Sequence, residues 1–327
     1  EGLDLLNRVP YQTGKPLFLK AAASIYGGLN DWENCQKILN ELISHFPDES
    51  YGYAALASSL LMVGKLSESV VLSKKAISCH MANFALLKEN GSRLDEIKIS
   101  KFDPKLAEET LKGVVGLLDK AKISYSLLAG TLLGLYRDGR LIPHDKDVDI
   151  GLLPGTNLDE VRTAFKDAKD WVFTEKSMAA SKRMISVRSN LTDMVADLFF
   201  LEEWKGKFRF GFHNPASVCL WEHKKFSTVK KTFHNFDYCV PDDIELNLKE
   251  MYGPDWRIPN SGFDSILASP NRDENSKQLS VGYGYKRLEV KIGDRSFKKA
   301  IWYINFLKGR VNDEWLSEIE AKIQDYV

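Results

Sequence analysis

The sequence predicts an α+β protein in which helical hairpins come first and a region of strands and helices follows. An internal repeat with a period of 34 residues runs through about Lys15–His80. From Asp103 onward, short apolar runs bounded by turn residues alternate with amphipathic segments. The first pattern is typical of stacked helical hairpins and the second of a sheet with packed helices. We therefore expect two domains, residues 1–100 and residues 101–327, the second carrying the helices that end the chain.

The repeat is visible when the sequence is offset by 34 residues. Ala21–Ser24 then aligns with Ala55–Ser58, and the apolar positions of the following segments also coincide. Small residues in a first helix, a short turn and an apolar second helix resemble the tetratricopeptide repeat. Two repeats are too few for an independent solenoid, so we expect them to stack on Leu3–Val9 or on the next domain. Two interpretations of the repeats remain open. They could form a groove that binds a protein partner or an acceptor, or they could be a purely structural cap.

Composition excludes several classes of protein. Lys plus Arg and Asp plus Glu number 45 each, so no overall positive field attracts nucleic acid. No apolar run is long enough to span a membrane, and we expect a cytoplasmic protein, with peripheral contact at the inner membrane face left open. Because the chain begins without Met in an apparent helix, it could be a piece of a longer protein.

The cysteines are scattered and form no Cys-x-x-Cys pair, which indicates reduced, mostly buried thiols without a disulfide framework. A zinc site is a weaker alternative, because its candidate ligands are irregularly spaced and buried Cys with surface His explains them better. These candidates are His213, Cys219, His223, His234 and Cys239.

The second region opens with a clear helix signal. Asp103 can cap a helix whose first residue is Pro104, and the apolar residues through Lys122 share one face. A buried strand over Tyr125–Ala129 should follow. Further strands are expected up to Leu153 and at Trp171–Thr174, Arg183–Arg188, Met194–Leu201, Lys207–Phe212 and Val218–Leu220. Helices are expected at Asn157–Ala168, Pro241–Tyr252, Ser296–Leu307 and Asn312–Tyr326. A long polar loop is expected over Ser261–Ser280. The helix at Ser296–Leu307 is apolar on most sides, and burial is favoured over a membrane or partner surface.

The stretch that points to chemistry is Gly130–Arg137, followed closely by Ile142–Gly151. Asp147 and Asp149 are separated by one apolar residue, so in a strand their carboxylates project from the same face. Two such charges repel unless a cation neutralises them, and oxygen ligands suit Mg²⁺ or Mn²⁺. The small residues Gly130 and Thr131 resemble the start of a short helix whose amides meet a phosphate.

A third acid strengthens this interpretation. Asp197 lies inside the apolar run Val195–Phe199, where an unpaired carboxylate would cost several kcal/mol. In a sheet beside Asp147 and Asp149 it would be a third metal ligand and could orient an attacking hydroxyl.

These segments together resemble the signature of the LicD/fukutin family of phosphotransferases. The resemblance rests on Gly130–Gly134 with Arg137, on Ile142–Gly151, on Ala196–Phe199, and on Pro241–Pro259 with its Tyr-Gly-x-x-Trp-x-x-Pro ending. It covers roughly residues 104 to 260. The family usually has an aromatic residue and an acid where His144 and Lys146 stand here.

The resemblance implies a nucleotidyltransferase-like fold, a mixed sheet flanked by helices. It also implies transfer of a phospho-substituent, such as phosphocholine, phosphoribitol or phosphoglycerol, from a CDP-linked donor to a hydroxyl of a glycan or glycolipid acceptor, with release of CMP. Asp147, Asp149 and Asp197 would hold one or two Mg²⁺ or Mn²⁺ ions. Phosphate contacts would come from Gly130, Thr131, Arg137, Arg140 and Lys146, with Arg183 a further candidate. Either Asp149 or Asp197 could be the base.

Two alternatives remain beside this hypothesis. A nucleotidyltransferase that uses an NTP shares the Gly-small and Asp-x-Asp layout but releases pyrophosphate, and the Tyr252–Pro259 element argues against it. A repeat scaffold with an inactive transferase domain is the non-enzymatic alternative, which the retention of all three acids disfavours.

Overall fold

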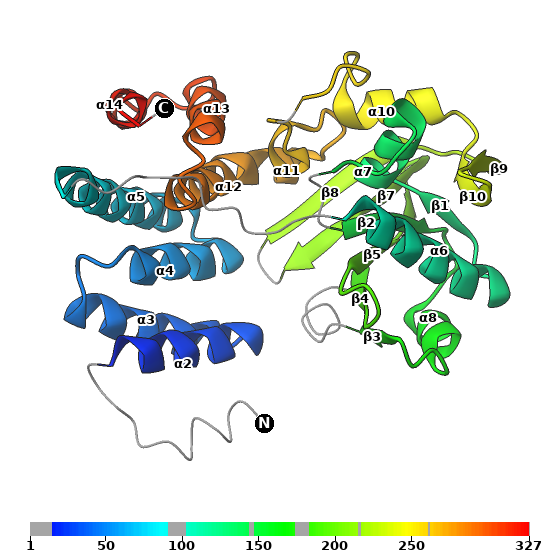
Figure 1. The fold of residues 1–327 in the computed structure, drawn as a ribbon, viewed down its shortest axis with the longest axis horizontal. Coiled ribbons are helices and arrows are strands. Elements are labelled where there is room, and N and C mark those ends of the chain that lie inside the picture. The colour runs from blue at the N-terminus through cyan, green and yellow to red at the C-terminus, as the bar shows by residue number, and fades with distance from the viewer. Residues whose placement is uncertain are drawn as a thin grey trace. The chain divides into compact units, whose positions relative to one another are not determined.

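A computed structural model describes residues 15–90, 103–143, 147–173, 183–214, 217–260 and 262–326. Its contacts divide the chain into two compact units (Figure 1). The helical unit comprises the N-terminal helices together with residues 278 onward, and the sheet unit lies between them in sequence. The chain therefore combines helical hairpins with a mixed sheet and flanking helices, which confirms the predicted α+β class.

The helical unit begins with two hairpins that repeat at the predicted spacing. They consist of α2 (Pro16–Gly28), α3 (Trp32–His45), α4 (Ser50–Met62) and α5 (Leu66–Glu89). Both α2 and α4, and likewise α3 and α5, begin 34 residues apart. Figure 1 shows these helices stacked in chain order. Leu19, Leu39 and Leu42 are fully buried between them, so the apolar positions of the repeat form the core.

The last helices of the chain belong largely to the same unit as these hairpins, whereas the first turn of α12 lies in the sheet unit. They are α12 (Glu274–Gly293), α13 (Phe297–Lys308) and α14 (Trp315–Gln324). His80 Nε2 lies 3.0 Å from Glu289 Oε1, and the rings of Phe84 and Phe297 meet edge to face at 5.8 Å. The division into residues 1–100 and 101–327 therefore differs from the observed units, because the end of the chain returns to the first one. Burial of Tyr303 and other large residues of α13 agrees with the favoured interpretation of that helix.

The predicted loop over Ser261–Ser280 is wrong for most of its length. It contains the short helix α11 (Ser265–Ala268) and the first turns of α12. The start of α12 escapes a pattern search because its opening residues are nearly all polar, whereas its buried aromatic and aliphatic residues come later. Among the described residues, no helix has both the length and the apolar character needed to cross a membrane.

The sheet unit is built on a five-stranded mixed sheet with the order β1-β2-β5-β4-β3. The strands are β1 (Tyr125–Leu127), β2 (Asp147–Leu152), β3 (Trp171–Phe173), β4 (Met184–Ser189) and β5 (Val195–Phe200). β2 and β5 are parallel, and the other pairs are antiparallel. Two strands distant in sequence are thereby aligned at the centre of the sheet.

Two helices pack against the apolar core of this sheet. These are α6 (Pro104–Lys120), whose Asp103 cap accepts hydrogen bonds from two backbone amides, and α8 (Leu158–Phe165). The core includes Leu111 and Val114 of α6, Val161 of α8, and the buried alternate residues of β2 and β5. The residues that alternate with these on β2 and β5 face away from this core. Near the start of each strand, these positions carry polar side chains.

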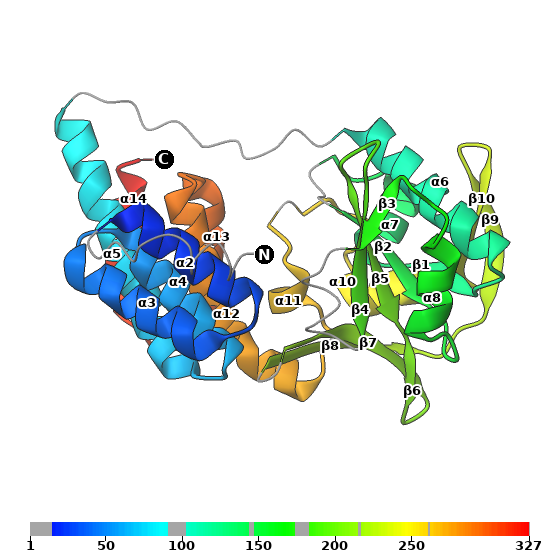
Figure 2. The ribbon, with the colours of Figure 1, turned by 90° about the horizontal axis from the view of Figure 1, so that it is seen from below.

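The second part of the sheet unit consists of a three-stranded sheet and a hairpin. The sheet comprises β6 (Glu202–Trp204), β7 (Lys207–Asn214) and β8 (Ser217–Lys224), and the hairpin β9 (Thr228–Phe233) and β10 (Phe236–Pro241). β8 extends beyond its prediction. The hairpin was not predicted because β9 is mostly exposed and carries consecutive lysines. Figure 2 shows the hairpin beside α6, where His234 contacts Glu108. Helix α10 (Ile244–Tyr252) follows at its predicted place.

Candidate active site

The three predicted acids lie on one face of the central strand pair. Asp149 on β2 is directly aligned with Asp197 on β5, and Asp147 is aligned with Val195. Residues aligned in parallel strands project to the same side, and residues two apart in a strand do so as well. All three acids are half-buried, whereas their neighbours Val148 and Ala196 are buried in the core on the other face. The register thus places a row of carboxylates at the start of β2 and β5.

Ser186 holds the Asp197 carboxylate in place. The two residues are aligned across the antiparallel β4–β5 pair, and the Ser186 hydroxyl donates a hydrogen bond to Asp197 Oδ1 at 2.5 Å. Burial raises the pKa of the Asp197 carboxyl, and the hydrogen bond from Ser186, which favours the ionised form, acts in the opposite direction. Ser186 did not emerge from the sequence. The available signal was a single hydroxyl between apolar residues in the predicted strand.

Thr131 supports the acids through the backbone. It belongs to α7 (Ala129–Leu133), which begins directly after β1 and continues as a π-helical turn, η1 (Gly134–Asp138). The chain enters α7 through Ala129 in the left-handed region, with φ of 46°. Thr131 is 1% exposed, and its Oγ1 accepts the Asp149 backbone N–H at 2.7 Å. The hydroxyl expected to meet a phosphate therefore already binds β2 next to Asp149, and Gly130 lies half-buried beside it.

Gly134 is required where α7 turns into η1. A Cβ at this position would lie 2.7 Å from the Arg140 carbonyl oxygen and 3.0 Å from the Ile142 amide nitrogen. Both are backbone atoms of the segment that leads toward Asp147, so they cannot yield as a flexible side chain would.

Gly134→Ala is therefore expected to lower the free energy of unfolding by about 1 to 3 kcal/mol, the usual range for overpacking. Thermal unfolding of the variant measures this loss. Gly116→Ala is the matched control, because a Cβ added to that helical glycine would have nothing within 4 Å. Ala at position 116 should raise the stability by about 0.5 to 1 kcal/mol. Equal effects of the two substitutions would contradict the packing argument.

The predicted arginines have different environments. The Arg137 guanidinium makes a two-point ion pair with Asp138, with both N···O distances at 2.8 Å, and this holds the pKa of Asp138 below its usual range. Arg140 is exposed, and Arg183 pairs with Glu202. Lys146, with its neighbour His144, lies outside the described residues. Arg137 and Arg183 thus form ion pairs with Asp138 and Glu202, which are not among the three predicted acids.

The Tyr252–Pro259 segment packs on η1. Trp256 is 5% exposed, its ring lies 6.0 Å from that of Tyr136, and its carbonyl accepts a hydrogen bond from Arg137 Nη1 at 3.3 Å. Arg257 stacks on Trp256 and forms an ion pair with Glu245 of α10. Two segments that resemble one family signature, and that are more than a hundred residues apart, therefore form one packed structure.

The structure also bears on the metal hypotheses. Within the described ranges, no three or more His, Cys, Asp or Glu side chains form a group able to hold a metal ion. Of the weaker zinc candidates, His223 bonds Glu250 and His234 bonds Glu108, while the side chain of His213 is not among those described. Cys219 is buried as expected, but His223 is buried and not a surface residue.

A magnesium site does not require a complete protein cage. Mg²⁺ is usually bound by one or two carboxylates, with waters and substrate phosphates completing the shell. The aligned pair Asp149 and Asp197 offers such oxygen ligands, and a cation would offset the cost of ionising the half-buried Asp197. The donor set therefore fits a divalent ion that arrives with a phosphorylated substrate.

A large hollow lies elsewhere in the sheet unit and does not coincide with the acids. A hollow of about 1200 Å³ lies between α6 and α8 and is lined by Pro154–Asn157, at the opposite end of β2 from Asp147. It contains none of the three acids. We place the candidate active site at Asp147, Asp149 and Asp197 because these positions combine half-buried charge with a defined strand register.

Comparisons with known proteins find relatives of the part of the chain that carries these acids. Residues 122–243 match the LicD/FKTN/FKRP nucleotidyltransferase domain, and this range contains all three acids. "Ribitol-5-phosphate transferase FKTN" of Homo sapiens is 27% identical over 184 residues, which cover 52% of this chain and 37% of that protein. "Ribitol 5-phosphate transferase FKRP" of Homo sapiens is 50% identical over 44 residues, 14% of this chain and 9% of that protein.

A bacterial relative extends the comparison. The uncharacterized protein RP689 of Rickettsia prowazekii (strain Madrid E) is 25% identical over 159 residues, which cover 45% of this chain and 54% of that protein. The match to FKTN spans little more than a third of that protein's length. The similarity to the LicD/fukutin family is therefore a property of the domain at residues 122–243.

Proposed function

We propose that this protein is a metal-dependent phosphotransferase. It moves a phospho-substituent, such as phosphoribitol, phosphocholine or phosphoglycerol, from a CDP-linked donor to a glycan hydroxyl and releases CMP. The observation that carries the proposal is the alignment of Asp149 with Asp197, with Asp147 on the same face, inside the matched domain. The fukutin relatives are ribitol-5-phosphate transferases by name, which supports the same reaction class.

Asp149 and Asp197, with Asp147 beside them, would hold Mg²⁺ or Mn²⁺. Such an ion neutralises the phosphate charge that develops during in-line displacement. The chain's own residues supply the positioning. Thr131 fixes the backbone at Asp149, and Ser186 fixes the Asp197 carboxylate, so both strand positions are defined before the donor binds.

Asp197 is the better candidate for the base that accepts the proton of the attacking hydroxyl. Burial raises the pKa of this carboxyl in the metal-free protein, and the hydrogen bond from Ser186 fixes its orientation, so it can accept a proton at a defined position. The sequence alone left this choice open between Asp149 and Asp197.

The helical unit would contribute at the level of recognition. We propose that its hairpins position the glycan acceptor or bind a protein partner, because stacked helical hairpins commonly present extended binding surfaces.

Identification of the leaving group tests the proposal. We expect the purified protein to release CMP from at least one of CDP-ribitol, CDP-choline and CDP-glycerol in the presence of Mg²⁺, and to stop when EDTA removes the ion. A parallel incubation with CTP tests the alternative NTP-dependent reaction, for which pyrophosphate would appear. Release of pyrophosphate but not CMP would establish that alternative. If neither product forms and calorimetry detects no binding of Mn²⁺ or cytidine nucleotides, the domain is a non-catalytic scaffold.

A further inference from the structure

A second polar hollow lies within the sheet unit, on the side of α10. It has a volume of about 720 Å³ and is bordered by β7 and β8, by α10 and the residues after it, and by residues 270–274 and 277. Leu246, Lys249, Glu250 and Gly253 line it at positions i, i+3, i+4 and i+7, so one face of α10 and its end form a wall. None of the three predicted acids borders this hollow.

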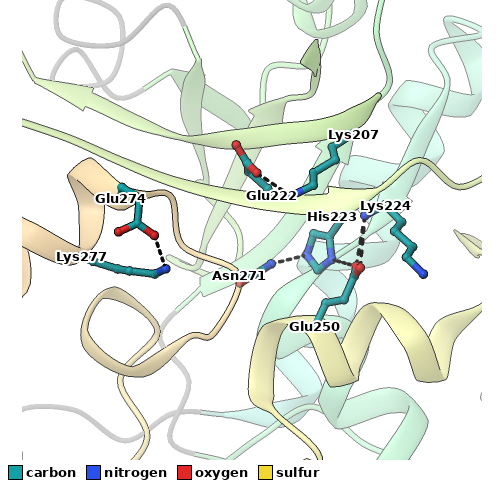
Figure 3. Close-up of polar contacts among 8 residues, drawn as sticks. All are labelled: Lys207, Glu222, His223, Lys224, Glu250, Asn271, Glu274 and Lys277. Atoms are coloured by element: carbon teal, nitrogen blue, oxygen red, sulfur yellow. Dashed lines mark hydrogen bonds and ion pairs between the residues drawn. The ribbon is translucent and has the colours of Figure 1, made fainter. Parts of the chain in front are cut away.

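Glu250 and Asn271, which line the hollow, belong to the hydrogen-bond network in Figure 3. His223 is 1% exposed, and its ring stacks on Phe210 with a centroid distance of 5.6 Å. Its Nδ1 lies 3.0 Å from Glu250 Oε2, and its Nε2 lies 3.2 Å from Asn271 Nδ2. Because the Asn271 amide nitrogen can only donate, Nε2 accepts and Nδ1 donates to Glu250. One buried ring thus joins β8, α10 and the segment that carries Asn271.

The segment after Asn271 is equally well held. Arg272 is buried, and its guanidinium donates to the carbonyls of Ser269 and Ile266, each at 2.9 Å. The Ser276 hydroxyl accepts the Leu220 N–H at 2.7 Å, which joins the start of α12 to β8. The walls are therefore held together by contacts within the protein before any ligand binds.

Every acid that lines the hollow already has a hydrogen-bond donor or a cation. Glu250 accepts from His223, and Asp273 caps the start of α12 by accepting the Ser276 N–H at 2.8 Å. The remaining two acids form ion pairs with lysines, Glu222 with Lys207 at 2.9 Å and Glu274 with Lys277 at 2.6 Å (Figure 3).

Two lysines of the hollow have no such partner. Neither Lys224 on β8 nor Lys249 on α10 makes an ion pair with a carboxylate of the described residues. Both side chains are exposed, and they come from different walls of the hollow. The charge still available to a ligand is consequently positive, although acids and bases line the hollow in similar numbers.

The hollow also adjoins the family signature. Gly253 and Pro254 form part of its wall and lead directly to Trp256, whose carbonyl bonds Arg137. A ligand bound here would contact the same segment that packs on η1.

We infer that this hollow binds an anionic group, a phosphate or a carboxylate, on the acceptor glycan, with Lys224 and Lys249 as its ligands. The inference rests on the proposed function for the identity of the acceptor. That both lysines border the hollow, and that neither makes an ion pair with a described carboxylate, does not depend on that function.

A matched pair of probes tests the inference. Ribitol 5-phosphate and ribitol differ only in the phosphate, and titrations followed by calorimetry, with CMP at saturation to occupy the nucleotide site, compare their binding. We expect ribitol 5-phosphate to bind and ribitol to bind at least about fivefold more weakly. The double variant Lys224→Gln/Lys249→Gln should lose about fivefold or more in affinity for ribitol 5-phosphate, the scale of two exposed ion pairs.

Two control variants separate charge from location. Lys224→Arg/Lys249→Arg keeps both charges and should retain binding. Lys105→Gln/Lys166→Gln removes two exposed lysines that do not border the hollow and should bind as the unchanged protein does. The inference is overturned if the Lys224→Gln/Lys249→Gln variant binds ribitol 5-phosphate normally, if the control loses as much, or if ribitol binds equally well. CMP release from the donor is measured separately, so a failure of the proposed function is distinguished from a failure of this site.

Discussion

Asp197→Asn is expected to reduce CMP release by a factor of about 10² to 10⁴, the usual contribution of a positioned acid or base. The substitution keeps the shape of the side chain, and the amide oxygen can still accept the hydrogen bond from Ser186. What disappears is the negative charge and the ability to take up a proton. A large loss of activity would therefore report on chemistry and not on misfolding.

The same substitution should stabilise the metal-free protein. Because burial raises the pKa of Asp197 in the folded state, ionising this carboxyl costs more in the folded than in the unfolded chain. That cost is absent at a pH below the unfolded pKa of about 3.9, grows as pH rises toward the folded pKa, and stays constant above it. Asn cannot ionise, so the advantage of the variant in Tm should appear as the pH is raised from about 4 toward neutrality.

Thermal unfolding in EDTA between acidic and neutral pH checks this prediction, with activity measured on the same samples. Asp193→Asn is the control, because the Asp193 side chain is 85% exposed in its ion pair with Arg188. It should change neither activity nor Tm appreciably. An Asp197→Asn variant that is less stable than the unchanged protein at neutral pH, with no gain at any pH, would contradict the burial argument.

Much of the candidate site follows from local sequence patterns. The i, i+2 spacing of Asp147 and Asp149 defines their shared face once β2 is a strand, and the apolar run around Asp197 identifies a second buried strand. The Asp103 cap and Pro104 likewise define the start of α6. Each of these features depends on residues close together in the chain, where periodicity and capping are strong constraints.

The pairing of distant segments could not be read in the same way. Nothing local determines that Asp149 aligns with Asp197, that Ser186 lies opposite Asp197, or that His223 meets Glu250. Strand register is a property of the packed sheet, since it depends on which apolar faces are buried together. The cost of burying Asp197 and the family resemblance together supplied the expectation that the acids meet, and the register shows the strand alignment.

The return of α13 and α14 to the helical unit was missed for a related reason. Their apolar faces require burial but do not specify a partner. The partner of these helices is determined by particular contacts, such as Lys74 with Asp313 and Phe84 with Phe297. A hydrophobic pattern therefore predicts that a helix is buried with more certainty than it predicts the unit to which the helix belongs.

Trp256→Ala is expected to cost about 3 to 5 kcal/mol in the stability of the sheet unit, the range for truncating a large buried aromatic residue. Trp256 belongs to the same core as Leu248 of α10 and Leu135 of η1, so its loss leaves a cavity between two elements. It also removes the ring against which Tyr136 and Arg257 pack. The Trp256 carbonyl accepts a hydrogen bond from Arg137, so displacement of this segment should also disturb η1. Because η1 continues α7, whose Thr131 bonds the backbone of β2, the disturbance should reach β2.

Hydrogen exchange of peptides that cover β2 and β5 measures the effect separately from the helical unit. Protection in both strands should fall in Trp256→Ala and be largely restored in Trp256→Phe, which keeps an aromatic ring in the core. Trp204→Ala is the matched control, because that side chain is 40% exposed and lies on β6. If exchange in β2 and β5 increased no more in Trp256→Ala than in Trp204→Ala, the Tyr252–Pro259 segment would not support the sheet that carries the acids. If protection falls only in the Trp256 variant, the Tyr252–Pro259 segment stabilises the strands that carry the three acids, through η1 and α7. That result would give a physical reason why these distant segments occur together in one signature.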